Sequence, residues 1–292
     1  MNINLEYYKI FYHVVAEHSI TGAARKLCIS QPAVTQAVKQ LEQGLGIELF
    51  TRHAKGVSLT KEGEELYSFV KKGYETILTG EEKIVKMINM EIGEVRIGAS
   101  DMTLQFYLLP HLEKFHQLYP EIKVTVTNAP TPQTVEHLRQ GRIDFGVVTS
   151  PLEDSHFDIV RVRKIRDIFV AGDKFRYLKE RKMDYKELAD LPLICLEGNT
   201  STRQYVDRFL DANQIRVTAE FELATSDMIV QFAMRNLGIG CVVEDFAKKQ
   251  IESGELIRLE FEHQIPERDM CLILDQSSTM STAASRLKEL LV

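Results

Sequence analysis

The stretch from Ser19 to Arg52 constrains the fold of this chain more than any other part of it. It reads SITGAARKLCISQPAVTQAVKQLEQGLGIELFTR and predicts two short helices joined by a tight turn. Thr21 is placed to cap the first helix, and Ser30 is a favourable N-cap for the second. Pro32 then falls in the first turn of the second helix, where its missing N–H removes no hydrogen bond. The stretch therefore predicts a helix-turn-helix unit.

The two predicted helices have faces of different character. Ala23 and Ala24 give the first helix a small inner face, so the second helix can approach it closely at a steep angle. The apolar residues of the second helix recur with a helical period and must face inward; they are Val34, Val38 and Leu41. Its other face is polar and almost free of carboxylates, and it carries Gln31, Thr35, Gln36, Lys39 and Gln40. Amides and hydroxyls suit base edges in a major groove, whereas the plain alternative is a solvated face on a packed helix pair.

The net charge is distributed unevenly along the chain. Residues 18–61 hold six Lys and Arg against two acidic residues, a local charge of +4, while the whole chain has a formal charge of −6. The rest of the chain therefore sums to −10. A basic element on an acidic protein is what contact with DNA phosphates requires, so the charge favours the DNA-reading interpretation.

A short hairpin is predicted after the two helices. Residues 49–52 and 57–60 read as strands, with residues 53–56 as the turn between them. Arg52, His53 and Lys55 are placed there to touch phosphate or to enter a minor groove. The alternative is a hairpin that is merely solvated, and the local positive charge favours the DNA contact.

The helix-turn-helix run resembles the N-terminal domain of LysR-type transcriptional regulators. The matching positions are Thr21, Ala23, Ala24, Leu27, Ser30, Gln31, Pro32, Ala33, Val34, Leu41, Glu42, Leu45, Gly46, Leu49, Phe50 and Arg52. Thr35 replaces the usual Ser and keeps the hydroxyl, and Gly44 slightly loosens a helix end. The resemblance implies a winged helix-turn-helix that reads double-stranded promoter DNA. The predicted DNA-binding residues are Arg25, Ser30, Gln31, Pro32, Thr35, Gln36, Lys39, Arg52, His53 and Lys55.

A long helix is predicted from Thr60 onward, with acidic residues in its first turns where they suit the helix dipole. Further along, the spacing alternates between three and four at Tyr67, Val70, Tyr74, Ile77, Glu81, Ile84 and Ile88. This period of 3.5 residues is typical of a coiled-coil seam, so we expect a homodimer in which a second copy covers the stripe. The alternative is packing on the chain's own domain. The resemblance also implies dimerisation through this helix, often extended to a homotetramer.

Strands and helices alternate after Gly93, which breaks the long helix. Their order predicts an α/β domain with an open, largely parallel sheet, and a second similar set suggests two lobes with a cleft between them. This half resembles the LysR-type effector-binding domain, which shares the fold of periplasmic solute-binding proteins. The expected domains are residues 1–60, 61–92 and 93–292. Lobe one is expected to comprise residues 93–164 and 268–292, and lobe two residues 165–267.

Four predicted strand ends carry small polar residues that lead into helices, at residues 100–103, 148–150, 198–202 and 225–227. Ligands of open α/β sheets bind beyond such ends, and hydroxyls with helix N-termini favour an anion. The effector-contacting positions that match the family are Ser100, Met102, Thr103, Thr149, Thr200, Ser201 and Thr202. We therefore expect a small anionic effector. Simple helix caps are the alternative, and Asp101 would repel an anion if it pointed inward.

Composition and motifs do not favour a membrane protein, a secreted protein, a metalloprotein or an enzyme. The chain of 292 residues has no apolar run long enough for a membrane span, and its N-terminal residues do not resemble a signal peptide. The four cysteines are far apart and the eight histidines lack ligand spacing, so no metal or other cofactor is expected. No nucleophile elbow, zinc-protease or nucleotide-loop motif indicates an enzyme.

Two further alternatives are a solute-binding protein and a redox switch. The first would need export, which the attached helix-turn-helix opposes. The second would require Cys195 and Cys241 to meet, although no basic neighbour marks either as a reactive thiolate. We therefore expect a cytoplasmic regulator whose effector changes the relative placement of paired DNA-binding domains. RNA polymerase is a candidate partner at the promoter.

Overall fold

The structure is a computed structural model that describes residues 3–53, 56–152 and 154–292. The chain divides into two compact units, Met1–Lys86 and Met87–Val292. Each unit has its own buried apolar clusters, so each is described by itself. No helix among the described residues combines the length and the apolar character needed to cross a membrane.

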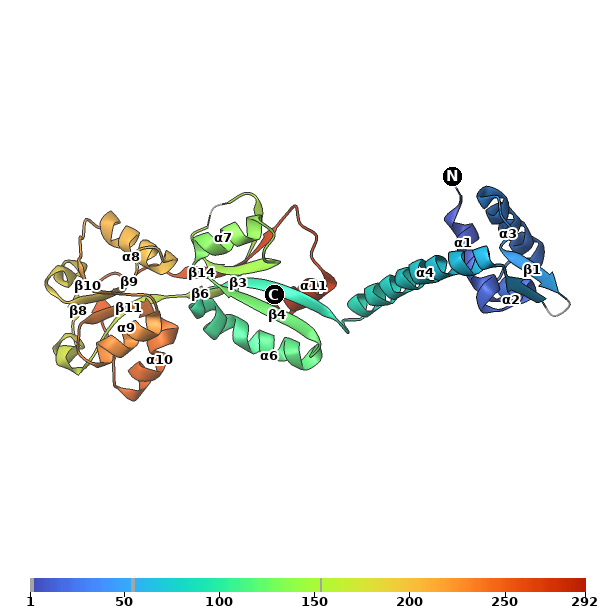
Figure 1. Ribbon diagram of the computed structural model, residues 1–292. Coiled ribbons are helices and arrows are strands. Elements are labelled where there is room, and N and C mark those ends of the chain that lie inside the picture. Colours follow the sequence, from blue (N-terminus) through green and yellow to red (C-terminus); the bar gives the residue numbers. More distant parts are fainter. Residues whose placement is uncertain (1–2, 54–55, 153) are drawn as a thin grey trace. The chain divides into compact units, whose positions relative to one another are not determined.

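The N-terminal unit is a winged helix-turn-helix followed by a long helix (Figure 1). Its elements are α1 (Leu5–Ala16), α2 (Ile20–Leu27), α3 (Gln31–Leu45), β1 (Phe50–His53), β2 (Gly56–Leu59) and α4 (Lys61–Ile88). The wing is the antiparallel pair β1–β2, in which Phe50 lies opposite Leu59. The first three helices enclose a small core that contains Ile10, Val14, Ala23, Val34 and Val38.

The helix ends follow from local hydrogen bonding. The side chain of Ser19, not of Thr21, caps α2, because the helix begins at Ile20 and the Ser19 hydroxyl accepts from the Gly22 N–H at 3.1 Å. Ser30 caps α3 as predicted, accepting from the Ala33 N–H at 3.4 Å. Gly44 also has a packing role: a Cβ there would lie 2.9 Å from the Ile3 side chain.

The predicted seam of α4 divides into two parts. Tyr67, Val70 and Tyr74 pack within the same unit: Tyr67 stacks on Tyr12 at 6.0 Å between ring centroids, and Tyr74 lies 4.8 Å from Tyr12. For these residues the alternative of packing on the chain's own domain is therefore what the structure shows.

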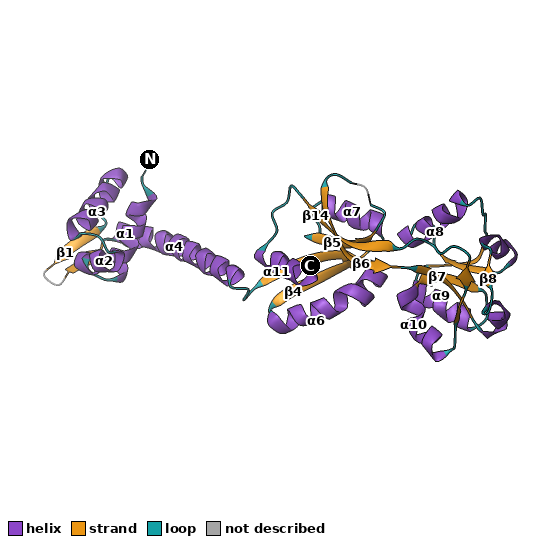
Figure 2. Cartoon of the chain, turned by 180° about the vertical axis from the view of Figure 1, so that it is seen from behind, coloured by secondary structure: helices purple, strands orange, loops and turns teal. Residues whose placement is uncertain are grey.

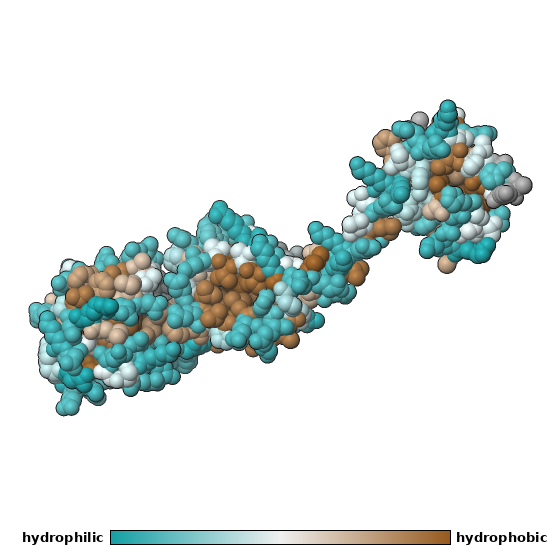
Figure 3. All heavy atoms as spheres, turned by 60° about the horizontal axis from the view of Figure 1, so that its bottom comes forward, coloured by the Kyte–Doolittle hydropathy of each residue, from teal (hydrophilic) through white to brown (hydrophobic). Residues whose placement is uncertain are grey.

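The rest of the α4 stripe is uncovered within its unit. Ile77 and Ile84 are 59% and 55% exposed, and Ile88, which ends the helix, is 61% exposed. Apolar atoms accordingly interrupt the polar surface along this helix (Figure 3). Helices with a single exposed apolar stripe are stabilised by a partner helix, so this surface fits a second copy of α4.

The C-terminal unit contains two five-stranded mixed sheets (Figures 1 and 2). The first has the order β4-β3-β5-β14-β6, in which β4, β3 and β5 are parallel and β14 is antiparallel to both of its neighbours. Its strands are β3 (Gly93–Ala99), β4 (Ile122–Asn128), β5 (Phe145–Thr149), β6 (Phe157–Ile165) and β14 (Arg268–Asp275). Strand β6 was not predicted from the sequence.

Helices cover both faces of the first sheet. The apolar residues of α7 (Thr131–Arg139) pack on one face, and those of α6 (Leu109–Leu118) and α11 (Thr282–Leu291) on the other. A short α5 (Asp101–Thr103) and a π-helical turn, η1 (Leu104–Leu108), connect β3 to α6.

The second sheet has the order β10-β9-β11-β7-β12. Strands β10, β9 and β11 are parallel, whereas β7 is antiparallel to β11. Its strands are β7 (Asp167–Ala171), β9 (Leu193–Leu196), β10 (Ala219–Leu223), β11 (Ile239–Val243) and β12 (Ile257–Arg258). A small pair, β8 (Lys182–Met183) with β13 (Glu260–Phe261), lies outside it. The helical elements of this lobe are η2 (Asp173–Leu178), η3 (Tyr185–Asp190), α8 (Ser201–Ala212), α9 (Ser226–Met234) and α10 (Glu244–Ser253).

The chain passes between the lobes twice, from β6 to β7 and back into β14. A buried ion pair joins the two crossings: Arg268 donates through Nε and Nη2 to the two Asp167 carboxylate oxygens, at 2.7 Å each. The side chains are 1% and 0% exposed. Arg268 also donates to the Thr202 hydroxyl at 3.1 Å and lies over the Tyr205 ring. This pair therefore ties both crossings to the start of α8.

Candidate functional site

The outer face of α3 is available to a large partner. Ser30, Gln31, Pro32, Gln36 and Lys39 are all exposed, whereas the apolar positions of the same helix are buried. Pro32 in the first turn and the Ser30 cap define where the helix begins, and hence which side chains its N-terminal end presents. A recognition helix contacts base edges mainly with such N-terminal residues.

Thr35 is more constrained than its neighbours on this face. It is half-buried, and its hydroxyl donates to the Gln31 carbonyl at 3.1 Å. The hydroxyl can still accept a hydrogen bond from a base, but its proton is engaged within the helix. The amides of Gln31 and Gln36, by contrast, have no hydrogen bond to the described residues, so each offers both a donor and an acceptor.

The basic side chains around this face lie on three elements. Arg25 of α2 and Lys39 of α3 are exposed, and His53 is exposed at the end of β1. Lys55 lies outside the described residues, and for Arg52 the structure describes the backbone of β1 but not the side chain. Positive charge beside a polar helix face supports non-specific attraction to DNA phosphates.

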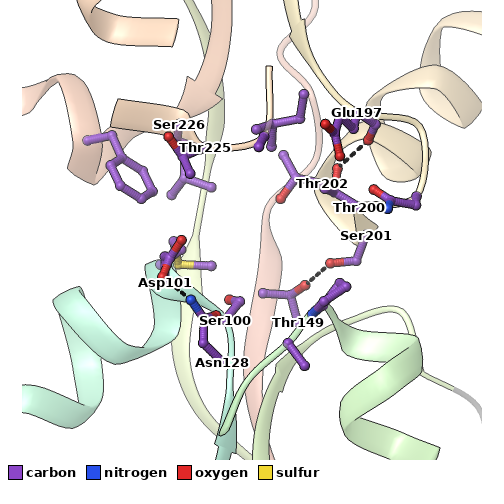
Figure 4. Close-up of a pocket in the computed structure, with 18 residues that line it drawn as sticks. Ser100, Asp101, Asn128, Thr149, Glu197, Thr200, Ser201, Thr202, Thr225 and Ser226 are labelled. Carbon is purple, nitrogen blue, oxygen red and sulfur yellow. Dashed lines mark hydrogen bonds between the residues drawn. The ribbon is translucent and has the colours of Figure 1, made fainter. Parts of the chain in front are cut away.

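A cavity of about 320 Å³ lies between the two lobes of the C-terminal unit (Figure 4). Residues at or just after the ends of β3, β4 and β5 of the first sheet face residues at or just after the ends of β9, β10 and β11 of the second. Its lining comprises Ser100, Asp101, Met102, Asn128, Ala129, Pro130, Thr149, Leu196, Glu197, Asn199, Thr200, Ser201, Thr202, Ala224, Thr225, Ser226, Val243 and Phe246. Both the volume and the place beyond the strand ends suit a small ligand.

Six of the seven predicted effector residues line this cavity: Ser100, Met102, Thr149, Thr200, Ser201 and Thr202. Thr103 does not. It is fully buried, and its hydroxyl donates to the Ser100 carbonyl at 2.9 Å, because it lies on the inner side of the first helical turn. Its contribution to the pocket is therefore to hold Ser100 in place.

Hydroxyl groups connect the lobes directly across the cavity. The Thr149 and Ser201 oxygens are 2.9 Å apart (Figure 4), and Thr131 donates to Ser201 at 3.3 Å. Thr149 ends β5 of the first sheet, whereas Ser201 begins α8 of the second lobe. A ligand that competes for these hydroxyls would therefore change a contact between the lobes.

Helix N-termini also point toward the cavity. The Thr200 hydroxyl caps α8, accepting from the Arg203 N–H at 3.3 Å. Thr225 precedes α9 but makes no side-chain cap, although both it and Ser226 line the cavity. The first-turn N–H groups of α9 thus remain available to an acceptor.

The charged groups of the lining differ from the anionic-effector expectation. Asp101 and Glu197 both line the cavity, and none of the described lining residues is Lys, Arg or His. Arg203, which could have balanced a carboxylate, is turned to other partners: Asp207, Glu222 and the Leu196 carbonyl. The cavity therefore carries two negative charges without a basic side chain in its wall.

Several lining residues have no signal in the sequence that predicts their place in the cavity. Asn128 ends β4, an edge strand of the first sheet, and Ala129 and Pro130 follow it; this strand end has no small polar motif like those that marked the others. Phe246 has no such signal in the sequence either, yet its ring centroid lies 4.7 Å from that of Phe106 of the first lobe. The order of the strands in the two sheets could have indicated the β4 end, but not the Phe246 contact.

Cys195 and Cys241 of the second lobe are buried in β9 and β11, and these two strands are neighbours in the sheet. Burial raises the pKa of Cys195 to about 11, and burial also raises the pKa of Cys241 well above its usual value. Thiols held in the protonated form are poor nucleophiles, which speaks against a redox switch at these positions. The described residues contain no cluster of three metal-ligating side chains.

Two family descriptions match the chain and together cover both of its units. "Bacterial regulatory helix-turn-helix protein, lysR family" matches residues 5–64, and "LysR substrate binding domain" matches residues 89–292. The chain belongs to the LysR family of transcriptional regulators. LysR-family membership makes the α3 face part of a DNA-binding domain and the C-terminal unit an effector-binding domain.

Named relatives of this LysR-family chain span nearly its full length. The HTH-type transcriptional activator CmpR of Synechocystis is 24% identical over 97% of this chain and 93% of its own. The RuBisCO operon transcriptional regulator of Allochromatium vinosum is 23% identical over 99% and 95%. The HTH-type transcriptional regulator YofA of Bacillus subtilis is 26% identical over 88% and 86%.

Solved structures show the same LysR-family fold. A full-length variant of OxyR from Pseudomonas aeruginosa superposes with a TM-score of 0.76 at 20% identity, covering all of both chains. Full-length CbnR, solved in complex with its target DNA, gives a TM-score of 0.63 at 17% identity over 99% of this chain and 98% of its own. At these identities the likeness concerns the fold and carries no residue roles.

Proposed function

We propose that this LysR-family regulator reads its promoter through the exposed polar face of α3, presented twice by a homodimer. The observation that carries the proposal is the contrast along one helix: buried Val34, Val38 and Leu41 against exposed amides. Arg25, Lys39, Arg52, His53 and Lys55 would contact phosphates, and Ser30, Gln31, Pro32, Thr35 and Gln36 would face the bases. The uncovered part of the α4 stripe supports pairing with a second copy, and a homotetramer would be a pair of such dimers.

Gln31→Ala is expected to weaken binding to the selected promoter by about 1–3 kcal/mol, because one amide pair to a base edge is lost. Binding to random DNA should change little, since phosphate contacts remain. The measurement is a titration of fluorescent promoter and random duplexes at two salt concentrations, with promoter fragments first selected from genomic DNA. Gln133→Ala, an exposed glutamine on α7 in the other unit, is the matched control. Equal losses on both duplexes would contradict the base-reading role.

Lys39→Ala should have the opposite pattern. The loss of one phosphate contact is expected to weaken promoter and random DNA alike and to reduce the slope of log affinity against log salt by about one. The same titration over a range of salt measures the slope. A loss confined to the promoter duplex would instead make Lys39 a base-reading residue.

We also propose that the cavity between the lobes binds the effector that controls promoter activity. The cavity is lined from both lobes, and the Thr149–Ser201 hydrogen bond crosses it, so a bound molecule would interact differently with open and closed arrangements. Ser201→Trp should fill this space. The variant is expected to bind the selected promoter fragments with unchanged affinity and to lose any effector-dependent change in transcription. A full response in Ser201→Trp would place the effector elsewhere.

The family is one of transcriptional regulators, and we infer further that the chain has no catalytic activity of its own. The described lining of the cavity offers hydroxyls, amides and two carboxylates, but no histidine, cysteine or lysine that would activate a nucleophile. We place its action in the cytoplasm, where promoter DNA and RNA polymerase are available to it.

A further inference from the structure

The two acidic side chains of the cavity come from different lobes. Asp101 begins α5 after β3 of the first sheet, and Glu197 follows β9 of the second. Both are exposed, and Figure 4 shows them on different sides of the cavity. Asp101 accepts a hydrogen bond from the Asn128 amide, which is neutral, and neither carboxylate belongs to an ion pair with the described residues. Two uncompensated negative charges thus face one space.

The nearest arginines do not neutralise them. The Arg203 Nε donates to Asp207 at 2.8 Å, and its Nη1 donates to Glu222 at 2.9 Å. Arg268 is buried against Asp167 behind Thr202. Each guanidinium is therefore already matched by a carboxylate. Closing the lobes on an empty cavity would bring like charges nearer, and their repulsion rises as the distance falls.

The opposite polarity is found at the helix N-termini. Thr225 and Ser226 lie at the start of α9, a helix of nine residues without a side-chain cap, and both line the cavity. Ser201 and Thr202 form the first turn of α8, where backbone N–H groups have no partner within the helix. These ends carry partial positive charge and donate hydrogen bonds. The cavity therefore has a carboxylate-lined part and a donor-lined part.

We propose that the effector is a small zwitterion of the amino-acid type, with an ammonium group between Asp101 and Glu197 and a carboxylate at the starts of α8 and α9. The proposal rests on the proposed function, in which this cavity is the effector site. An ammonium group placed between the two lobes replaces their repulsion by attraction to both. The positive group is therefore the part of the ligand that favours closure, and the carboxylate fixes its orientation.

The test is calorimetric titration of the full-length protein with molecules that differ in charge. The probes are the twenty protein amino acids and a matched set of five-carbon chains: 5-aminopentanoate, glutarate and cadaverine. At least one zwitterion is expected to bind, with an affinity at least tenfold lower in Asp101→Asn and in Glu197→Gln. Glutarate should bind more weakly than 5-aminopentanoate to the native protein. Cadaverine, which has no carboxylate to contact the starts of α8 and α9, should also bind more weakly than 5-aminopentanoate.

Matched controls separate a local effect from a change in net charge. Asp211→Asn near the end of α8 and Glu220→Gln on β10 remove exposed carboxylates that do not line the cavity, and their affinities should stay within twofold of the native protein. Failure of every zwitterion to bind overturns the proposal. So does a zwitterion whose affinity is unchanged in both cavity variants.

One result would overturn the effector class while leaving the proposed function intact. If only glutarate bound, and Ser201→Trp abolished that binding, the cavity would still be the effector site but its ligand would be an anion. If a molecule altered promoter binding equally in the native protein and in Ser201→Trp, the proposed function of the cavity itself would be wrong. The two failures are thus distinguishable with the same variants.

Discussion

Asp167→Asn is expected to lower the free energy of unfolding of the C-terminal unit by about 3–5 kcal/mol, the usual effect of breaking a buried ion pair by removing one partner. Arg268 would be left charged and almost fully buried, and its Nη1 already has no hydrogen-bond partner among the described residues. Water cannot replace the lost carboxylate in a site this enclosed. Urea unfolding followed by circular dichroism measures the effect.

Two comparisons test the cause of that loss. Replacing both partners by apolar residues, in Asp167→Leu with Arg268→Met, should cost less than the single change, because no charge remains buried. Arg286→Met removes a partner from the exposed pair with Glu289 and should change stability little. A double variant less stable than Asp167→Asn would show that the site contributes through packing rather than charge.

Phe11→Ala is expected to destabilise the N-terminal unit by about 3–5 kcal/mol, the range for emptying a buried aromatic site. Phe11 is fully buried, and its ring lies 5.3 Å from Phe50 of the wing and 6.3 Å from Tyr67 of α4. One side chain thus joins three elements. DNA binding should fail at a temperature at which the C-terminal unit remains folded.

The measurement is thermal unfolding followed by two signals, promoter binding and circular dichroism. Leu5→Ala, in the same helix but with a residue that is 80% exposed, is the matched control and should leave both transitions near their native temperatures. If Phe11→Ala lowered both transitions together, the two units would unfold as one, contrary to the division of the chain into separate compact units.

Elements with strong local patterns could be predicted from the sequence. The sequence predicts strands at residues 122–128, 193–196 and 239–243 and a helix at residues 282–291. These bounds agree with β4, β9, β11 and α11, because each segment has a clear alternation, apolar run or helical period between turn residues. Strand β6 was missed because it is an edge strand that carries exposed charges, including Asp158 and Arg161, which mask its alternation.

Pairings between distant residues could not be predicted in this way. Strand β14 inserts between β5 and β6 and is antiparallel to both, which makes the sheet mixed although its first three strands are parallel. The Arg268–Asp167 pair joins residues 101 positions apart. Local periodicity contains no information about either partner.

The candidate site was predictable in its position but not in its charge. Strand ends followed by small polar residues indicated the edge at which the cavity lies, because parallel strands bring their carboxyl ends together. The individual positions, six of which line the cavity, were those that match the LysR family. The side chain of Glu197 had no local signal, and only the fold shows that it shares a cavity with Asp101. Arg203 directly follows the strand end at residues 198–202, so its sequence position alone would place its guanidinium near the cavity. Its ion pairs with Asp207 and Glu222 hold the guanidinium away from the cavity lining.

The packing of α1 on the first half of α4 has a mechanical consequence. The Tyr12 ring contacts Tyr67 and Tyr74, and the His13 ring contacts Tyr74. The first half of α4 therefore moves together with the helix-turn-helix as one rigid body. If α3 reads DNA as proposed, a twist applied at the far end of α4 would rotate α3 relative to the DNA without changing the fold of the N-terminal unit. Inserting one residue after Thr79 should therefore rotate the helix-turn-helix by about 100° relative to the C-terminal end of α4. We expect the dimer of this variant to prefer a different spacing between the two DNA half-sites.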